Sequence, residues 1–371
     1  MSKGLEGVVA ASTAISYIDG INGRLFYRGI EINELAEKST FEETTALLWY
    51  GKLPTKAQLE SFDSKFKSNR QIPNEVLALM MSMPRQTTAM EVLRTAVSAL
   101  SAYDPQDEDN SLEANVAKSI RLTASLPTIV AAWHRIRSGL WPIPPNTTLS
   151  HAANFLYMLA GEEPSATAAH ILDTCLILHA DHSLNASTFA ARITASTLSD
   201  LHSAIVSAIG TLKGPLHGGA NEQVMRMLLE VGDPDRAEQW TRGALAAKKK
   251  IMGFGHRVYK ADDPRAKWLQ RLSHDLAESS GNHTWYDISE RVRAVVQDAK
   301  PLPVNVDFYS ASVYYTLGIP IDLFTPIFAI SRVAGWTAHV YEQYSDNRLI
   351  RPEAEYVGPM DVQYVPLAER G

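Results

Sequence analysis

The sequence has few of the features that mark secreted, membrane-spanning or nucleic-acid-binding proteins. Its 371 residues include a single cysteine, Cys175, which excludes an intramolecular disulfide and any cysteine-rich metal site. No apolar run approaches the roughly 18 residues of a membrane span, and the opening MSKGLEGVVA lacks the apolar core of a signal peptide. The net charge of -6 argues against a broad basic face for nucleic acid. We therefore predict a cytoplasmic enzyme or binding protein.

The composition is that of an ordinary globular protein, with 45% hydrophobic and 20% charged residues. A chain of this length exceeds the size at which one core usually keeps growing, so we expect two domains. Glycine and proline punctuate KGPLHGG and LGIP, which predict two joints. We predict a large domain made of residues 1–214 and 316–371, with a smaller domain, 215–315, inserted in it. Movement at the joints would close a cleft between the domains.

Local patterns predict helices almost throughout. The exception is ISYIDGINGRLFYRG, which alternates around Asn22-Gly23 and predicts an N-terminal β-hairpin with a two-residue turn. Helix starts are expected at Thr40 with Glu43, Thr55 with Gln58, Thr88 with Glu91, Asp263-Pro264, Asp287 with Glu290, and Thr325-Pro326. Helix ends are expected at Gly51, Gly281 and Gly318. The predicted fold class is all-α.

One stretch, GFGHRVYKADDPR at 253–265, concentrates glycine, one histidine and several cations in an otherwise acidic chain. It lacks the third glycine of a dinucleotide motif and the Gly-Lys-Ser/Thr of a P-loop. Backbone groups of its first three residues suit a flat heterocycle, and Lys260 suits a phosphate, although a solvated basic loop explains this stretch alone equally well. Arg265 falls in the first turn of a predicted helix, which favours a carboxylate ligand or an ordinary surface salt bridge.

Three further candidates stand in distinctive surroundings. His217 in PLHGGAN precedes a predicted helix, whose positive end favours a neutral ring able to donate to a carbonyl oxygen. An ordinary turn histidine is the alternative. Asp307 in NVDFYS stands where an N-cap is expected, and would be a general base only if a cleft brings it to a substrate. Arg332 in AISRVAGW lies among apolar neighbours, where a charge needs an anion or a buried ion pair.

The segment HADHSLNASTF carries His179 and His182 at i and i+3, which predicts that they share one helical face. Such a pair could bind a metal, but no glutamate lies between them and no third ligand is evident. Structural or substrate-binding use is favoured, and we predict no metal site.

The segments HADHSLNASTF, LKGPLHGGANE, GFGHRVYKADDPR, PVNVDFYS, ISRVAGW and NRLIRPEAEYVG, taken in this order, resemble citrate synthases over almost the whole chain. The length resembles the short, dimeric bacterial and archaeal type. The resemblance implies a helical fold, a Claisen-type condensation of acetyl-CoA with oxaloacetate, and hydrolysis of citryl-CoA to citrate and coenzyme A. It also implies a homodimer that needs no metal or other cofactor.

The resemblance implies a role for each matching residue. His217 would polarise the thioester carbonyl of acetyl-CoA, Asp307 would remove a methyl proton, and His256 would activate the ketone of oxaloacetate. The implied oxaloacetate-binding residues are His182, Arg265, Arg332 and, reaching in from the partner subunit, Arg351. The implied coenzyme A contacts are Gly253, Phe254, Gly255, Lys260 and Lys300.

Three alternatives stay open at this point. A 2-methylcitrate synthase would use propionyl-CoA with the same residues, since one methyl group is worth only about 1–3 kcal/mol in a pocket. A non-catalytic coenzyme A-binding regulatory relative is disfavoured because His217, His256 and Asp307 are all retained. A metal-dependent hydrolase built on His179 and His182 would be excluded by activity that survives a chelator.

One residue, Ser183, departs from the many relatives that carry an acidic residue there.

Overall fold

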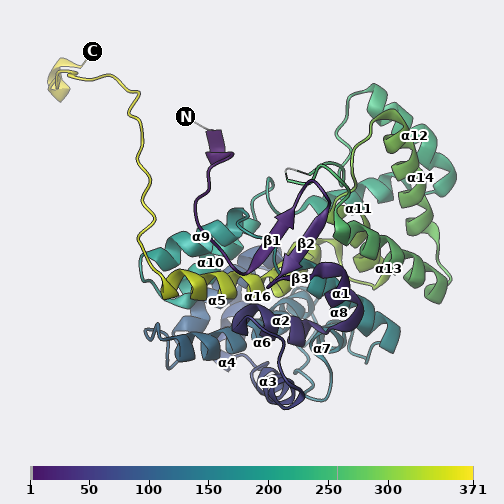
Figure 1. The fold of residues 1–371 in the computed structure, drawn as a ribbon, viewed down its shortest axis with the longest axis horizontal. Coiled ribbons are helices and arrows are strands. Elements are labelled where there is room, and N and C mark those ends of the chain that lie inside the picture. The colour runs from purple at the N-terminus through teal and green to yellow at the C-terminus, as the bar shows by residue number, and fades with distance from the viewer. Residues whose placement is uncertain (1–2, 257, 371) are drawn as a thin grey trace.

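The computed structural model describes residues 3–256 and 258–370, and within them the chain is helical apart from one small N-terminal sheet (Figure 1). This confirms the predicted fold class. The α-helices are α1 (Ile32–Lys38), α2 (Phe41–Tyr50), α3 (Lys56–Ser68), α4 (Asn74–Ser82), α5 (Ala89–Ser101), α6 (Leu112–Arg137), α7 (His151–Ala160), α8 (Ala166–His179), α9 (Ala186–Ser196), α10 (Leu201–Leu212), α11 (Ala220–Val231), α12 (Pro234–Ala246), α13 (Pro264–Ser280), α14 (Thr284–Ala299), α15 (Val306–Thr316) and α16 (Phe324–Ser345). No helix in the described part combines the length and the apolar character that crossing a bilayer would take.

The sheet is antiparallel, in the order β1 (Ser16–Asp19), β2 (Arg24–Tyr27), β3 (Ile30–Glu31). Asp19 pairs with Arg24, so the first turn has four residues, 20–23, and the predicted two-residue turn is wrong. The Asp19 carboxylate accepts from the backbone N–H of Asn22 at 3.0 Å and from its side-chain amide at 2.7 Å. A side chain that bonds to the backbone in this way closes a wider turn than the Asn-Gly pair alone would.

Several helices begin where their capping signals predicted. Reciprocal capping boxes form at Thr55 with Gln58 and at Thr88 with Glu91. Thr40 caps α2, and Pro264 opens α13. Two predicted starts are wrong, because α14 begins three residues before Asp287 and α16 begins one residue before Thr325.

Helix α16 is the centre of the larger part of the molecule. It contacts α2, α5, α6, α8, α9, α10 and α11, and 18 of its 22 residues are buried. Figure 1 shows it crossing the middle of the helical assembly. A helix that is apolar on all sides belongs in the interior. Close approach is possible because Gly335 has no side chain, since a Cβ atom there would lie 2.4 Å from the Ala180 carbonyl oxygen.

The helices α11 to α15 pack mainly on one another and form a group at one side of the molecule (Figure 1). The group is joined to the rest at 213–219, between α10 and α11, and at 317–323, between α15 and α16. These contacts are the ones expected of a small domain at 215–315. The domain boundaries and the movement of the domains stay predictions.

Candidate active site

Six predicted side chains come from segments that meet where the α11–α15 group joins the remaining helices. His182 follows α8, His217 lies in the turn before α11, His256 precedes α13, Arg265 is in α13, Asp307 is in α15 and Arg332 is in α16. The ring centroids of His182 and His256 are 5.3 Å apart. Arg265 and Arg332 both act electrostatically on His182 and Asp307.

His256 is held in one protonation form by its own loop. Its Nδ1 accepts from the backbone N–H groups of Val258, at 3.0 Å, and Tyr259, at 3.1 Å. Because both partners are donors, the proton of the neutral ring is on Nε2. Burial, assisted by the Arg265 charge, lowers the pKa of His256 to about 4. At neutral pH His256 is therefore an uncharged Nε2–H donor.

His217 has the opposite tautomer. The backbone N–H of Ser187 donates to its Nε2 at 3.2 Å, and the Ser187 hydroxyl lies 2.8 Å from the same nitrogen. The ring proton is therefore on Nδ1. Burial, with a smaller contribution from Arg332, lowers the pKa of His217 to about 4. The predicted neutral ring is therefore due mainly to burial and not, as we expected from the sequence, to the positive end of a helix. Next to it, a Cβ atom on Gly218 would lie 2.1 Å from the Leu212 carbonyl oxygen, so the turn requires glycine.

The Asp307 carboxylate is not used to cap its helix. The N-cap of α15 is Asn305, whose side chain accepts from the Asp307 N–H at 3.1 Å, and the expectation of an N-cap at Asp307 is wrong. Burial raises the pKa of Asp307 to about 6, against the opposing effect of Arg265 and Arg332. A carboxylate with such a pKa is a better proton acceptor near neutral pH than an ordinary surface aspartate.

The two buried arginines differ in their partners. Arg265 bonds twice to Asp263, through Nε at 2.9 Å and Nη2 at 2.7 Å. Burial alone would lower the pKa of Arg265, but the Asp263 carboxylate outweighs it and raises the pKa. Arg332 donates from Nε to the His179 carbonyl oxygen at 2.7 Å and lies over the Phe328 ring, and it has no carboxylate at ion-pair distance among the described residues.

The charge on Arg332 is therefore buried without a directly paired carboxylate among the described residues. Burial lowers the pKa of Arg332 to about 10, and the more distant carboxylates of Asp181 and Asp307 oppose this only in part. Burying a cation in this way costs free energy, which an anionic ligand would offset. Of the two interpretations that the sequence left open for Arg332, the buried ion pair is not found within the described residues. The site thus has an unpaired positive charge beside neutral histidines.

The glycine loop is mostly occupied by its own fold. The Gly253 carbonyl accepts from the Asn305 N–H at 3.0 Å, the Gly255 N–H donates to Pro303 at 2.8 Å, and the Asn305 amide donates to the Gly255 carbonyl at 3.0 Å. The expectation of free backbone groups throughout 253–255 is thereby corrected. Of the three loop residues 253–255, only Phe254 has neither its N–H nor its C=O hydrogen-bonded to another described residue.

Three predicted residues lie apart from this cluster. Lys260 and Lys300 have exposed side chains, and the Lys260 N–H ties its loop to the Gly20 carbonyl in the hairpin turn at 2.8 Å. Arg351 is exposed in the extended segment that follows α16. Arg257, which contributes to the cationic stretch, lies outside the described residues.

The two histidines of HADHSLNASTF do not share one helical face, so that expectation is wrong. His179 ends α8 and donates from Nδ1 to the Cys175 carbonyl at 2.7 Å, while His182 lies in the loop beyond. Across residues 3–256 and 258–370, the one group with metal-compatible geometry is Asp107, Asp200 and His202. None of these three was a predicted site residue.

Ser183 adopts a left-handed backbone conformation, with φ at 51°. Its N–H donates to the Asp181 carboxylate at 3.0 Å and to the Ser16 hydroxyl at 2.9 Å. These bonds fix the turn that follows His182. The departure at Ser183 therefore lies in a turn held through its backbone and not through its side chain.

Comparison with known proteins assigns the family. A family profile described as "Citrate synthase, C-terminal domain" matches residues 4–353. The protein named citrate synthase 2 of Bacillus subtilis (strain 168) is 50% identical over 370 residues, covering 100% of this chain and 99% of that protein. The chain belongs to the citrate synthase family. Members of this family are acyltransferases, and so is this enzyme.

Two other members of the citrate synthase family bear on its substrates. The citrate synthase of Thermoplasma acidophilum, solved in a ternary complex with carboxymethyl coenzyme A and oxaloacetate, superposes with a TM-score of 0.94 at 35% identity, over 100% of this chain and 99% of that one. The 2-methylcitrate synthase of Mycobacterium tuberculosis (strain ATCC 25618 / H37Rv) is 45% identical, over 96% of this chain and 91% of that protein.

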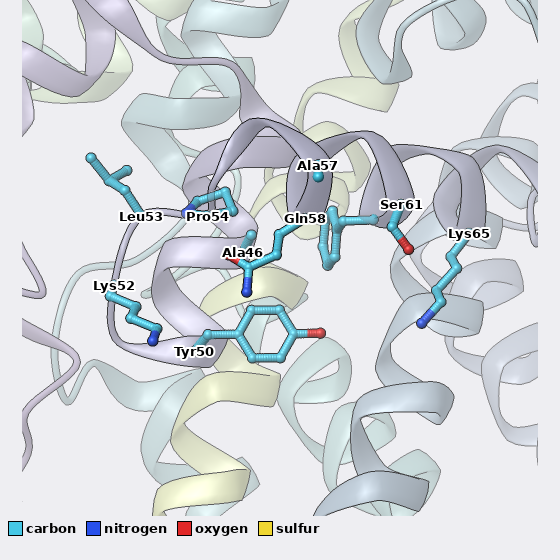
Figure 2. Close-up of a pocket in the computed structure, with 10 residues that line it drawn as sticks. Ala46, Tyr50, Lys52, Leu53, Pro54, Ala57, Gln58, Ser61 and Lys65 are labelled. Atoms are coloured by element: carbon cyan, nitrogen blue, oxygen red, sulfur yellow. The ribbon is translucent and has the colours of Figure 1, made fainter.

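Sequence reasoning missed two residues, Ser187 and Tyr259, that contact histidines of the candidate active site. Ser187 lies within HADHSLNASTF but contacts His217 only after folding, 30 positions away. The hydroxyl of buried Tyr259 lies 3.3 Å from His182 Nε2. None of the predicted residues lines the pocket of about 540 Å³ between α2 and α3 (Figure 2).

Proposed function

We propose that the enzyme condenses acetyl-CoA with oxaloacetate and hydrolyses the resulting citryl-CoA. The strongest support is the pair of neutral histidines with opposite tautomers, one presenting Nε2–H and the other Nδ1–H, together with Asp307, whose carboxyl group has a pKa of about 6 and feels the charges of Arg265 and Arg332. Enolisation of a thioester needs a base and a hydrogen-bond donor at once, because a carboxylate alone is too weak.

Oxaloacetate would bind first to the cations. Arg332 offers a buried guanidinium with no carboxylate partner in the described chain, and Arg265 is held rigidly by Asp263. His182 is buried, and burial together with both arginine charges lowers its pKa well below the usual value. A neutral His182 can hydrogen-bond to the substrate without adding a further charge.

The reaction would then proceed through proton removal and carbon–carbon bond formation, before citryl-CoA is hydrolysed. Asp307 takes a proton from the methyl group of acetyl-CoA while His217 donates a hydrogen bond from Nδ1 to the thioester oxygen, which becomes the enolate oxygen. The enolate carbon attacks the ketone carbon of oxaloacetate, whose oxygen receives a hydrogen bond from Nε2 of His256. Both donors are oriented before the substrates arrive, which lowers the cost of stabilising negative charge.

Coenzyme A would bind along the glycine loop. Phe254 supplies a backbone N–H and a C=O that bond to no other described residue and suit the adenine, and the exposed ammonium groups of Lys260 and Lys300 suit the phosphates of coenzyme A. Gly253 and Gly255 would act by shaping the loop, since φ is positive at both and a Cβ atom on Gly253 would lie 2.6 Å from Phe308. None of these proposed coenzyme A contacts requires a metal ion.

We further propose a homodimer in which Arg351 completes the partner's site. The segment after α16 runs away from the body of the molecule in extended form (Figure 1). Its exposed apolar side chains include Tyr356, Val357, Met360, Val362, Tyr364 and Leu367. Apolar side chains gathered along an extended segment favour cover by another surface, and a second copy of the chain would provide it.

Mixing subunits tests the dimer. Arg351→Ala and Asp307→Ala proteins, each inactive alone, should regain part of the activity when hybrids form, because one site per hybrid then has both groups. Hybrids demonstrated by mass spectrometry that remain inactive would refute the contribution of Arg351 across the interface.

The chemical proposal is tested by free-thiol release from acetyl-CoA and, separately, propionyl-CoA, with oxaloacetate and a strong chelator present. Preference for acetyl-CoA would support citrate synthesis without a metal. Preference for propionyl-CoA would favour 2-methylcitrate synthesis. This is the second candidate function because a 45% identical mycobacterial relative is named 2-methylcitrate synthase. Release from neither would leave a non-catalytic coenzyme A-binding protein.

A further inference from the structure

The central helix α16 carries Arg332 of the proposed anion site and, one turn later, Trp336, which contacts the surroundings of His217. Arg332 and Trp336 are four residues apart, so they lie on one face of the helix, and both side chains are fully buried. The indole Nε1–H of Trp336 donates to the Ser187 hydroxyl oxygen at 3.0 Å. That oxygen lies 2.8 Å from Nε2 of His217.

The direction of these hydrogen bonds follows from which atoms carry protons. An indole N–H can only donate, so it occupies one lone pair of the Ser187 oxygen. The Ser187 hydroxyl then has one proton to give, and its acceptors are His217 Nε2 and the Asn185 side-chain oxygen at 2.8 Å. The backbone N–H of Ser187 also donates to Nε2 of His217, at 3.2 Å, so that nitrogen carries no proton and the Ser187 hydroxyl can only donate to it. The Asn185 oxygen is the competing acceptor for the same hydroxyl proton, and the Trp336 N–H, by occupying a lone pair of the Ser187 oxygen, helps to set the direction in which that proton points.

We propose that Trp336 is a positioning residue for the reaction. Its N–H fixes the Ser187 hydroxyl so that His217 keeps Nε2 as an acceptor and presents Nδ1–H to the thioester oxygen. The inference rests on the role proposed above for His217. Because Arg332 is one turn away, a single rigid helix would set both the anion site and the tautomer of His217.

Burial of a tryptophan does not by itself require such a bond. Trp133 of α6 is also fully buried, yet its indole N–H has no hydrogen-bond partner among the described residues. The two tryptophans therefore make a matched pair. Replacing either by phenylalanine removes ring volume and an indole N–H, but only at Trp336 does the change remove a bond to Ser187.

The kinetic test compares Trp336→Phe with Trp133→Phe in the full-length enzyme. Loss of one hydrogen bond that supports the transition state should lower kcat about 3- to 10-fold in Trp336→Phe. The KM for oxaloacetate should change less than twofold, because Arg332, His182 and Arg265 remain. In a Ser187→Ala background, Trp336→Phe should cause no further loss.

A second readout does not depend on turnover. Two-bond ¹H–¹⁵N correlation spectra of protein labelled in its 11 histidines report which ring nitrogen carries the proton, and His217→Asn assigns the relevant signals by their disappearance. The wild-type signals should show Nδ1–H, and Trp336→Phe should shift them toward a tautomer mixture. If Trp336→Phe fails to fold, Trp336→benzothienylalanine keeps the shape and removes only the N–H.

Three results would overturn the proposal. These are equal kinetic losses at the two tryptophans, losses at Trp336 and Ser187 that multiply in the double variant, and an unchanged His217 tautomer in a folded Trp336 variant. Failure of the proposed chemistry would look different, because His217→Asn would then keep its activity while the tautomer spectra still responded to Trp336.

Discussion

Replacing Asp307 by asparagine should stabilise the unliganded protein at neutral pH while abolishing turnover. Burial raises the pKa of this carboxyl from 3.8 to about 6. The charged form is therefore disfavoured in the folded state, and the destabilisation is absent below pH 3.8 and complete above pH 6. Asparagine has nearly the same shape and no charge, so the variant escapes this cost.

The size of the effect follows from the shift. A difference of about 2.2 units at 1.36 kcal/mol each gives about 3 kcal/mol as an upper limit at pH 8, and about half of that at pH 5. Because the side chain keeps some contact with solvent, we expect about 1–3 kcal/mol at pH 8. Loss of a general base should lower kcat by about 10²–10⁴-fold.

The measurement is thermal unfolding of both proteins at pH 5 and pH 8 without substrates, paired with oxaloacetate titration. Asp298→Asn, at an exposed position of α14, is the control and should change neither stability nor turnover. A gain that is absent, or equal at both pH values, would show that the Asp307 carboxylate is not desolvated. Loss of oxaloacetate binding in Asp307→Asn would show that Asp307 holds the substrate instead of taking its proton.

Other outcomes follow from the same geometry. The pH profile of kcat/KM should have an acidic limb near pH 6, set by deprotonation of Asp307, because His217 and His256, with pKa values of about 4, stay neutral there; a limb near pH 4 would contradict this assignment. Arg332→Leu should weaken oxaloacetate binding in calorimetry at least about 30-fold without destabilising the unliganded fold, and a large loss of stability would instead make Arg332 structural. Gly218→Ala should displace the His217 turn and cost most of the activity, because the added Cβ atom would lie 2.1 Å from a carbonyl oxygen. Its control, Gly243→Ala, lies in the interior of α12 with open space around it and should stabilise by up to about 1 kcal/mol in denaturant unfolding.

What the sequence could predict was set by how local each interaction is. The Thr55–Gln58 capping box spans four residues and forms as expected. The start expected at Asp287 is wrong because the Asn282 side chain, just beyond Gly281, accepts from the Thr284 N–H at 3.1 Å and allows α14 to begin earlier. That signal was present in the sequence but weaker than a paired Asp and Glu.

In the site, too, local features could be predicted from the sequence, whereas long-range contacts could not. The sequence could indicate that Arg332 is buried, because its neighbours along the helix are apolar. It could not indicate that its Nε bonds to a carbonyl 153 positions earlier in the chain, or that no carboxylate of the described residues lies at ion-pair distance from it. The tautomers of His217 and His256 depend on backbone donors placed by folding, and no residue pattern reports them.

The central position of α16 also has a consequence for biosynthesis. Helix α2 ends at Tyr50, whereas α16, against which α2 packs, begins at Phe324. At about 5–20 residues per second, the ribosome needs roughly 15–55 s to bridge that gap, and in that time the inner face of α2 has no native partner there. A nascent chain that stops short of α16 lacks both the central helix of the larger part of the molecule and Arg332. The proposed anion site can therefore be completed only when α16, which carries Arg332, has been made.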